Sequence, residues 1–150
     1  MSIEELFREG LLKKIIPSDE RAEKSLEVSE KYLAEAKRSM NVEAYDLTII
    51  GSYSSSFHAA RAILFRDGVS ERSHFAIYEY LKQKHKSLGT EHINSFDLYR
   101  KLRHSTAYGL DSVIRREDAR EALNFAEGFL KTVKAYLKLK QDSRDRNCRK

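Results

Sequence analysis

The stretch EDAREALNFAEGFLKTVKAYLKL, at residues 117–139, decides the fold because it carries the clearest helical pattern in the chain. Its apolar residues recur at steps of three and four and therefore share one helix face: Ala119, Ala122, Leu123, Ala126, Phe129, Leu130, Val133, Tyr136 and Leu137. A helix of this length is a rod of roughly 30 to 35 Å. Its apolar face needs a second apolar surface, so the stretch predicts one member of a helical bundle.

The same periodicity runs upstream with few interruptions. Pro17 and Ser18 predict a break in the chain followed by a good helix N-cap. The helix that begins there carries a second apolar stripe, formed by Ala22, Leu26, Leu33, Ala36 and Met40. A long amphipathic helix is expected here.

The remaining segments predict further helices with short breaks between them. One is expected over about residues 44–65, ended by Asp67-Gly68, where glycine supplies a left-handed cap. Others are expected at residues 3–15, at 74–85, and from an N-cap at Thr90 to a C-terminal cap at Gly109. Because no strand alternation competes, the expected fold is all-α, an antiparallel helical bundle of about five to six helices.

The length and the charge of the chain limit which domain organisation is possible. At 150 residues with 41% hydrophobic content, one domain with its own core is expected, and we assign it residues 1–140. Residues 141–150 are expected to form a basic, flexible tail that carries Arg144, Arg146, Arg149 and Lys150. The net charge of +5 suits contact with phosphates.

Several classes of function have no support in the sequence. The single cysteine, Cys148, excludes a disulfide framework and a cysteine-based metal site. The histidines are scattered, so neither a metal site nor a cofactor is predicted. No phosphate-binding glycine loop or nucleophile elbow occurs. The first residues lack an export signal and no apolar run reaches the roughly 20 residues of a membrane span, so a cytoplasmic location is expected.

The segment YSSSFHAARAILFRDG, residues 53–68, contains the first candidate site. Ser54, His58 and Arg61 line up along one side of the expected helix and place a hydroxyl, an imidazole and a guanidinium in one polar groove. Two interpretations stay open: a buried helix whose few polar groups are satisfied, or a binding groove.

The segment LYRKLRHSTAYGL, residues 98–110, contains the second candidate site. Arg100, His104 and Tyr108 follow one another at four-residue steps and share a helix face, whereas Arg103 leans toward the apolar side. Burial of a guanidinium is costly unless it is paired or borders a wet cleft. Arg103 therefore either meets a carboxylate across the bundle or lines a pocket.

Three segments together resemble a known family. FHAARAILFRDG at residues 57–68, SERSHFAIYEYL at 70–81 and RKLRHSTAYG at 100–109, in this order, are similar to the HEPN domain, in particular its stand-alone prokaryotic branch. The similarity extends over nearly the whole chain except the last ten residues. It implies a helical bundle that forms a homodimer. It also implies a relation to the ribonucleases of the family. These carry an arginine, then a polar residue, and a histidine five to seven positions after the arginine, and the three side chains converge in the dimer cleft.

Residue by residue, Arg103 matches the family arginine and His104 the polar residue that follows it, but Tyr108 stands where the histidine is expected. In a metal-free cleavage the histidine serves as acid or base and the arginine stabilises the phosphorane-like charge. A phenol with a reference pKa of about 10 replaces it poorly. His104 projects about 100° from Arg103 on an α-helix, so its convergence with Arg103 is expected to need an unwound helix end near Gly109.

Three functions follow from the resemblance and these residues. The first is a regulatory HEPN domain whose dimer cleft binds a nucleotide or RNA phosphate through Arg103, His104, Tyr108, Arg100, His58 and Arg61, with a degenerate nuclease motif. The alternative is a metal-independent ribonuclease of the toxin–antitoxin type with Arg103 and His104 catalytic. A further alternative is an interaction module for a nucleotidyltransferase partner, with Tyr108 as a possible acceptor of a nucleotidyl group.

Overall fold

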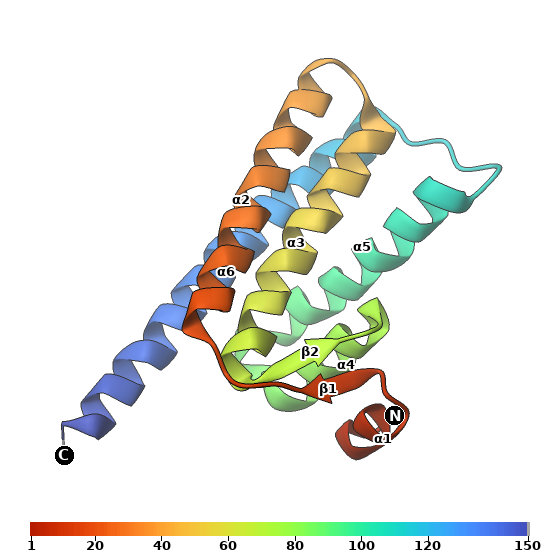
Figure 1. Cartoon of the computed structure of the whole chain (residues 1–150). Coiled ribbons are helices and arrows are strands. Elements are labelled where there is room, and N and C mark those ends of the chain that lie inside the picture. The colour runs from red at the N-terminus through yellow and green to blue at the C-terminus, as the bar shows by residue number, and fades with distance from the viewer. Residues whose placement is uncertain (150) are drawn as a thin grey trace.

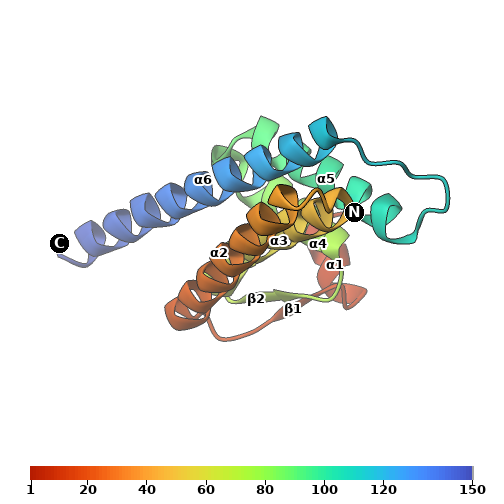
Figure 2. The ribbon, with the colours of Figure 1, turned by 90° about the horizontal axis from the view of Figure 1, so that it is seen from above.

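The computed structural model describes residues 1–149 and shows a bundle built around long helices (Figure 1). They are α2 (Asp19–Asn41), α3 (Tyr45–Asp67), α5 (Thr90–Tyr108) and α6 (Arg116–Cys148). Along the chain these four helices alternate in direction, and α3 contacts each of the other three. Viewed from above, α6 crosses over the α2–α3 pair (Figure 2). The predicted all-α antiparallel bundle is confirmed.

The core forms where the predicted apolar stripes meet α3. Every member of the stripes of α2 and α6 is buried. Small residues let α2 and α3 approach closely, since a Cβ at Gly51 would come within 3.3 Å of the Ala36 Cβ. Across the same contact the buried Ser29 hydroxyl donates to the Ser55 carbonyl at 2.6 Å. Helix α3 is therefore the central helix of the bundle.

The N-terminal segment differs from the prediction of one helix over residues 3–15. Helix α1 (Ile3–Arg8) ends before Gly10, whose φ of +74° takes the chain out of the helix. Strand β1 (Leu12–Lys14) then pairs in antiparallel fashion with β2 (Val69–Glu71). The expectation of a helix continuing to Ile15, and of a chain without strands, was wrong because pairing with a distant segment overrides the local pattern.

The caps at the start of α2 and the end of α3 are confirmed. The Ser18 hydroxyl accepts from the backbone N–H of Arg21 at 3.0 Å. Gly68 adopts the left-handed conformation with φ of +80° and ends α3. Its carbonyl accepts from the Ile15 N–H at 2.9 Å, and this bond ties the N-terminal segment to the end of α3.

Helix α4 (His74–Lys84) and a short 3₁₀ turn, η1 (Lys86–Leu88), connect the second strand to α5. Gly89 holds the N-cap position of α5 in place of the predicted Thr90, which is the first helical residue. Gly109 is the C-cap as expected, with an extended backbone, and its N–H donates to the Ser105 carbonyl at 2.8 Å.

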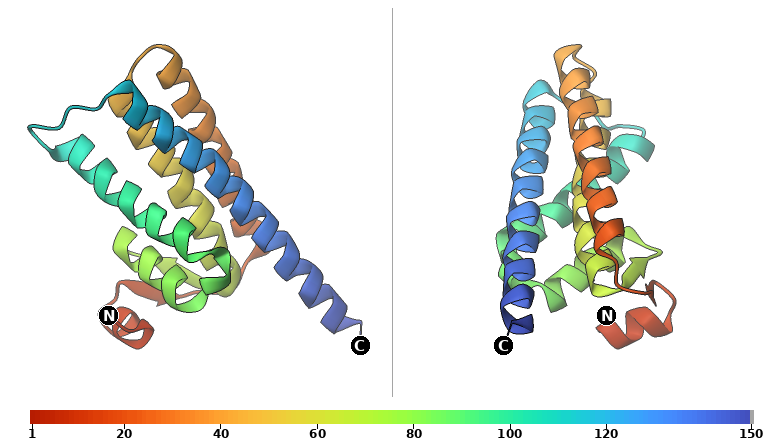
Figure 3. Two further views of the ribbon diagram at one scale, coloured as in Figure 1. Left: turned by 180° about the vertical axis from the view of Figure 1, so that it is seen from behind. Right: turned by 60° about the vertical axis from the view of Figure 1, so that its left-hand side comes forward.

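Helix α6 is longer than its apolar face. Its predicted end near Leu139 was wrong, because the helix continues through Cys148 and spans about 50 Å (Figure 3). Arg144 in this extension contacts Asp19 at the start of α2 at 3.2 Å. Lys150, the last of the predicted tail cations, lies outside the described residues. The flexibility of the tail and the division of the chain at residue 140 stay predictions.

Candidate functional site

The C-terminal half of α5 borders a cavity of about 350 Å³. Arg100, Arg103, His104 and Tyr108 all line it, so four of the six predicted site residues lie together. The other walls come from Tyr53 of α3 and His74 of α4. The cavity therefore combines two guanidiniums, two imidazoles and two phenols.

Arg100 is held in place by a carboxylate. Its Nε lies 2.7 Å from Asp97 Oδ1, and Lys101 Nζ approaches the other oxygen of the same carboxylate at 3.2 Å. Asp97 is buried and sits one turn earlier on α5. The single negative charge of Asp97 is thus shared by two cations, Arg100 and Lys101. The side of α5 that faces the cavity therefore keeps an excess of positive charge.

The sequence left open whether Arg103 meets a carboxylate or lines a pocket, and its surroundings in the structure decide between the two. Its Nε is buried without a hydrogen-bond partner, and among residues 1–149 no carboxylate lies within ion-pair distance of its guanidinium. The guanidinium instead lies 5.8 Å from the centroid of the Tyr108 ring and borders the cavity. Arg103 lines a pocket rather than meeting a carboxylate across the bundle.

His74 and Tyr53 were missed by the sequence reasoning. The Tyr53 hydroxyl and His74 Nδ1 share a hydrogen bond of 2.9 Å. Burial is the main cause that lowers the pKa of His74, followed by the charges of Arg103 and Arg100. The ring is therefore neutral near pH 7. No local signal marks these residues, because they come from two helices that only the fold brings against α5.

His104 and Tyr108 form the outer part of the cavity. Their ring centroids lie 5.1 Å apart, and Tyr108 is 65% exposed. Helix α5 remains regular through Tyr108, yet His104 and Arg103 both border the cavity. Their convergence therefore does not need the unwound helix end that the sequence suggested.

His58 and Arg61 lie in a different place. They line a separate, shallower hollow of about 280 Å³ beside α2. Arg61 Nε pairs with Glu71 at 2.8 Å, and the His58 ring stacks on Tyr32 with centroids 5.5 Å apart. Burial, followed by the charge of Arg61, lowers the pKa of His58 to about 4. The structure does not bring these two residues into the α5 cavity.

The predicted polar groove on α3 is in large part satisfied by contacts within α3 and with its neighbours α2 and β2. The Ser54 hydroxyl donates to the Ile50 carbonyl at 2.9 Å, and the His58 carbonyl accepts from the Ser25 hydroxyl at 2.6 Å. These contacts favour the interpretation of α3 as a buried helix whose polar groups are paired. The α5 cavity is therefore the stronger of the two candidate sites.

Within residues 1–149 no group of three histidine, cysteine or carboxylate side chains is placed to hold a metal ion. Among the same residues, none of the helices combines the length and apolar character needed to cross a bilayer.

Comparison with known proteins identifies the family. No curated protein matches the sequence. The family model of the HEPN domain matches residues 22–136, which include α3, α4, α5, nearly all of α2 and most of α6. This match contains every residue that lines the α5 cavity. With more than half of its length matched, the chain belongs to the HEPN domain family.

Proposed function

We propose that the α5 cavity binds the phosphate of a nucleotide or of RNA. The observation that carries the proposal is Arg103, a guanidinium that is partly buried beside a cavity with no carboxylate to neutralise it. A cation in this position is stabilised when an anion enters. The planar fork of N–H donors matches two oxygens of a phosphate.

The remaining lining residues suit the other parts of a nucleotide. The exposed rings of His104 and Tyr108 offer surfaces on which a base stacks. Neutral His74 has one ring nitrogen bonded to Tyr53 and the other free to bond a ribose hydroxyl or a phosphate oxygen. Arg100, fixed by Asp97, adds a second positive charge.

A homodimer cleft is part of the proposal. Several large apolar side chains are exposed between the middle of α5 and the loop that follows it: Leu98, Tyr108, Leu110 and Val113. A cluster of this kind next to a polar site is typical of a protein interface. In a homodimer the leucine and valine side chains would be covered, and two α5 cavities, each with its Tyr108 ring, would face one shared cleft. Sedimentation velocity of the wild type and of Leu98→Glu measures this association.

The binding test uses a fluorescent oligoribonucleotide, with nucleoside monophosphates as competitors, and follows anisotropy. Loss of one charge-assisted contact weakens binding about tenfold, so Arg103→Ala is expected to raise the dissociation constant by at least this factor. Arg38→Ala is the matched control, because Arg38 is an exposed arginine on α2 that borders none of the described cavities. Equal affinities of the two variants would contradict the proposal.

A metal-independent ribonuclease is the second candidate function, and His74 favours it. A neutral imidazole beside Arg103 supplies the base that Tyr108 cannot, even though His74 lies outside the family motif. The test is RNA cleavage in the presence of EDTA. This candidate predicts activity that disappears in Arg103→Ala, His104→Ala and His74→Gln. Inactivity of the wild type at high protein concentration excludes it and leaves the regulatory binding function.

A nucleotidyltransferase partner is the third candidate, supported by the exposure of Tyr108. Its hydroxyl is open to a second protein, and Arg103 lies beside its ring. A toxin–antitoxin pair of this kind predicts a mass increase of one nucleotidyl group after incubation with the transferase and its nucleotide. Tyr108→Phe removes the acceptor oxygen, so the same increase in that variant would exclude this candidate.

A further inference from the structure

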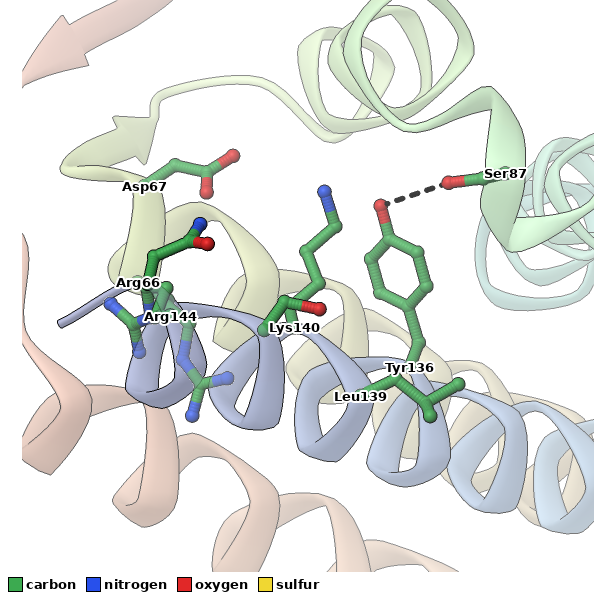
Figure 4. A pocket seen from close by; sticks show the side chains of 9 residues that line it. Arg66, Asp67, Ser87, Tyr136, Leu139, Lys140 and Arg144 are labelled. Carbon is green, nitrogen blue, oxygen red and sulfur yellow. Dashed lines mark hydrogen bonds between the residues drawn. The ribbon is translucent and has the colours of Figure 1, made fainter. Parts of the chain in front are cut away.

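A second cavity lies far from the α5 site, where the C-terminal half of α6 passes the end of α3 and the turn η1 (Figure 4). Its volume is about 590 Å³, within the range of small-molecule sites. The two cavities have no lining residue in common. Nothing in the proposed function uses this second cavity.

A hydrogen-bonded chain connects the buried His85 to side chains that line this cavity. His85, only 5% exposed, lies with Nε2 2.5 Å from Asp67 Oδ2 and with Nδ1 2.6 Å from the Tyr136 hydroxyl. Tyr80 donates to the same Asp67 oxygen at 2.8 Å. Asp67 and Tyr136 both line the cavity, so a fixed polar network presents one carboxylate and one hydroxyl to it.

The state of the network follows from the charge of Asp67. Burial raises the pKa of Asp67, but the hydrogen bond and charge of His85, the Tyr80 hydroxyl and the charge of Lys140 together lower it below its usual value. The ionised carboxylate therefore accepts from His85 Nε2–H. Ser87 completes the chain by donating to the Tyr136 oxygen at 3.4 Å.

Cations outnumber carboxylates around the cavity. Arg66 and Arg144 both pair with the single carboxylate of Asp19, at 3.0 and 3.2 Å. Lys140 forms no ion pair among residues 1–149, and its ammonium lies 5.2 Å from the centroid of the Tyr136 ring. In Figure 4 Lys140 points toward the space between Asp67 and Tyr136. Two positive charges on α6 therefore border the open space: Arg144 is paired with Asp19, and Lys140 acts on the ionised Asp67 without forming an ion pair with it.

An apolar surface lies beside these charges. Leu139, on the same stretch of α6, is 65% exposed and lines the cavity. The stem of Lys140 and the ring of Tyr136 extend this surface. A ligand that fits both parts has an anionic head and a small apolar body.

We infer that this second cavity binds a small organic phosphate monoester, with its phosphate held by Lys140 and Arg144 and its apolar body against Leu139. Arg66, Lys140 and Arg144 stand against the carboxylates of Asp67 and Asp19, so one positive charge is in excess. A phosphate offsets this charge and offers one more acceptor oxygen than a carboxylate does. The Ser87–Tyr136–His85–Asp67 chain fixes the wall that faces the ligand. This inference is independent of the function proposed for the α5 cavity.

The test is a titration of the ¹⁵N-labelled full chain with phenyl phosphate, followed by NMR. We expect the largest shift changes at the amides of Ser87, Lys140 and Arg144. Lys140→Gln removes a solvent-accessible charge without disturbing the core and should weaken binding about tenfold. Lys131→Gln is the matched control, because Lys131 precedes Lys140 by nine residues and so lies about 180° away on the same helix. The control should bind as the wild type does.

Two further measurements show which ligand and which cavity cause the shift changes. Inorganic phosphate should bind more weakly than phenyl phosphate, and equal binding would overturn the assignment of an organic ester. Arg103→Ala should leave the shift changes at Ser87, Lys140 and Arg144 unchanged, whatever it does to signals around the α5 cavity, so failure of the α5 proposal and failure of this one are distinguishable. The inference is overturned if shift changes occur only around the α5 cavity, if none occur, or if Lys140→Gln and Lys131→Gln bind alike.

Discussion

Two neighbouring arginines on α5 should respond in opposite ways when each is replaced by methionine. Arg103 carries a buried donor without a partner, whereas Arg100 neutralises the buried carboxylate of Asp97 at 2.7 Å. Methionine keeps an unbranched apolar stem of similar length and removes the charge. The two variants therefore isolate the guanidinium contribution at each position.

The magnitude follows from the partners. An unsatisfied buried donor costs about 1 to 3 kcal/mol, and because the Arg103 head borders an open cavity we take about 1 kcal/mol. Arg103→Met should therefore raise the free energy of unfolding by about 1 kcal/mol, which is roughly 2 to 4 °C in Tm for a chain of this size. Arg100→Met leaves Asp97 with Lys101 alone and should lower the free energy of unfolding by about 1 to 2 kcal/mol.

Urea unfolding followed by far-ultraviolet circular dichroism measures both changes. Binding of the oligoribonucleotide should fall in both variants, so Arg103→Met would be more stable and less able to bind. If Arg103→Met destabilises the protein as much as Arg100→Met does, Arg103 has a structural partner and the argument for the α5 site is refuted.

Further predictions concern pH and the backbone. Because the pKa of His58 falls to about 4 on folding, the unfolded chain binds more protons between about pH 6.5 and 4, so stability is greatest above this range and is lost as the pH falls through it. Solvent screening at this half-buried ring reduces the full value of roughly 3 kcal/mol to about 1 to 2 kcal/mol, and His58→Gln should flatten the profile of urea midpoints over this range. Gly68→Ala should cost about 2 kcal/mol or more, since φ is +80° and the new Cβ would lie 2.8 Å from the Ile15 carbonyl oxygen. Gly128→Ala, where the Cβ meets nothing within 4 Å in the middle of α6, should instead add about 0.5 to 1 kcal/mol; thermal unfolding of the pair checks the contrast, and equal losses would contradict it.

The local pattern of apolar residues was sufficient to predict most of the helices. The stripes that begin at Ala22 and Ala119 are buried along their whole length, and the left-handed cap at Gly68 ends α3 where expected. Such features depend on neighbours three and four residues away, and these are visible in the sequence.

The features that the sequence did not predict depend on contacts with residues far along the chain. Strand β1 exists because Leu12 to Lys14 pair with residues 69–71, and a three-residue strand has no periodicity of its own. The extension of α6 is polar on all sides, so no apolar stripe marks it beyond Leu139. Its residues continue the helix and reach Asp19 through Arg144.

The candidate site was predicted only in part, because local spacing is visible in the sequence and contacts between distant segments are not. Arg100, His104 and Tyr108 share one helix face at four-residue steps, so their closeness could be predicted without knowledge of the fold, whereas for Arg103 the sequence left a pocket and a buried ion pair both open. Tyr53 and His74 reach the cavity only through the packing of α3 and α4 against α5. His58 was grouped with the α5 residues, but it faces α2, where Tyr32 stacks on it.

The projecting end of α6 also provides a position for spectroscopic labels. Cys148 is the single cysteine of the chain and is exposed at the tip of this helix. A maleimide spin label would therefore attach at one defined point without any other substitution. In an assembly of two chains, each α6 would carry one such label, and pulsed electron spin resonance would report the distance between the two helix tips.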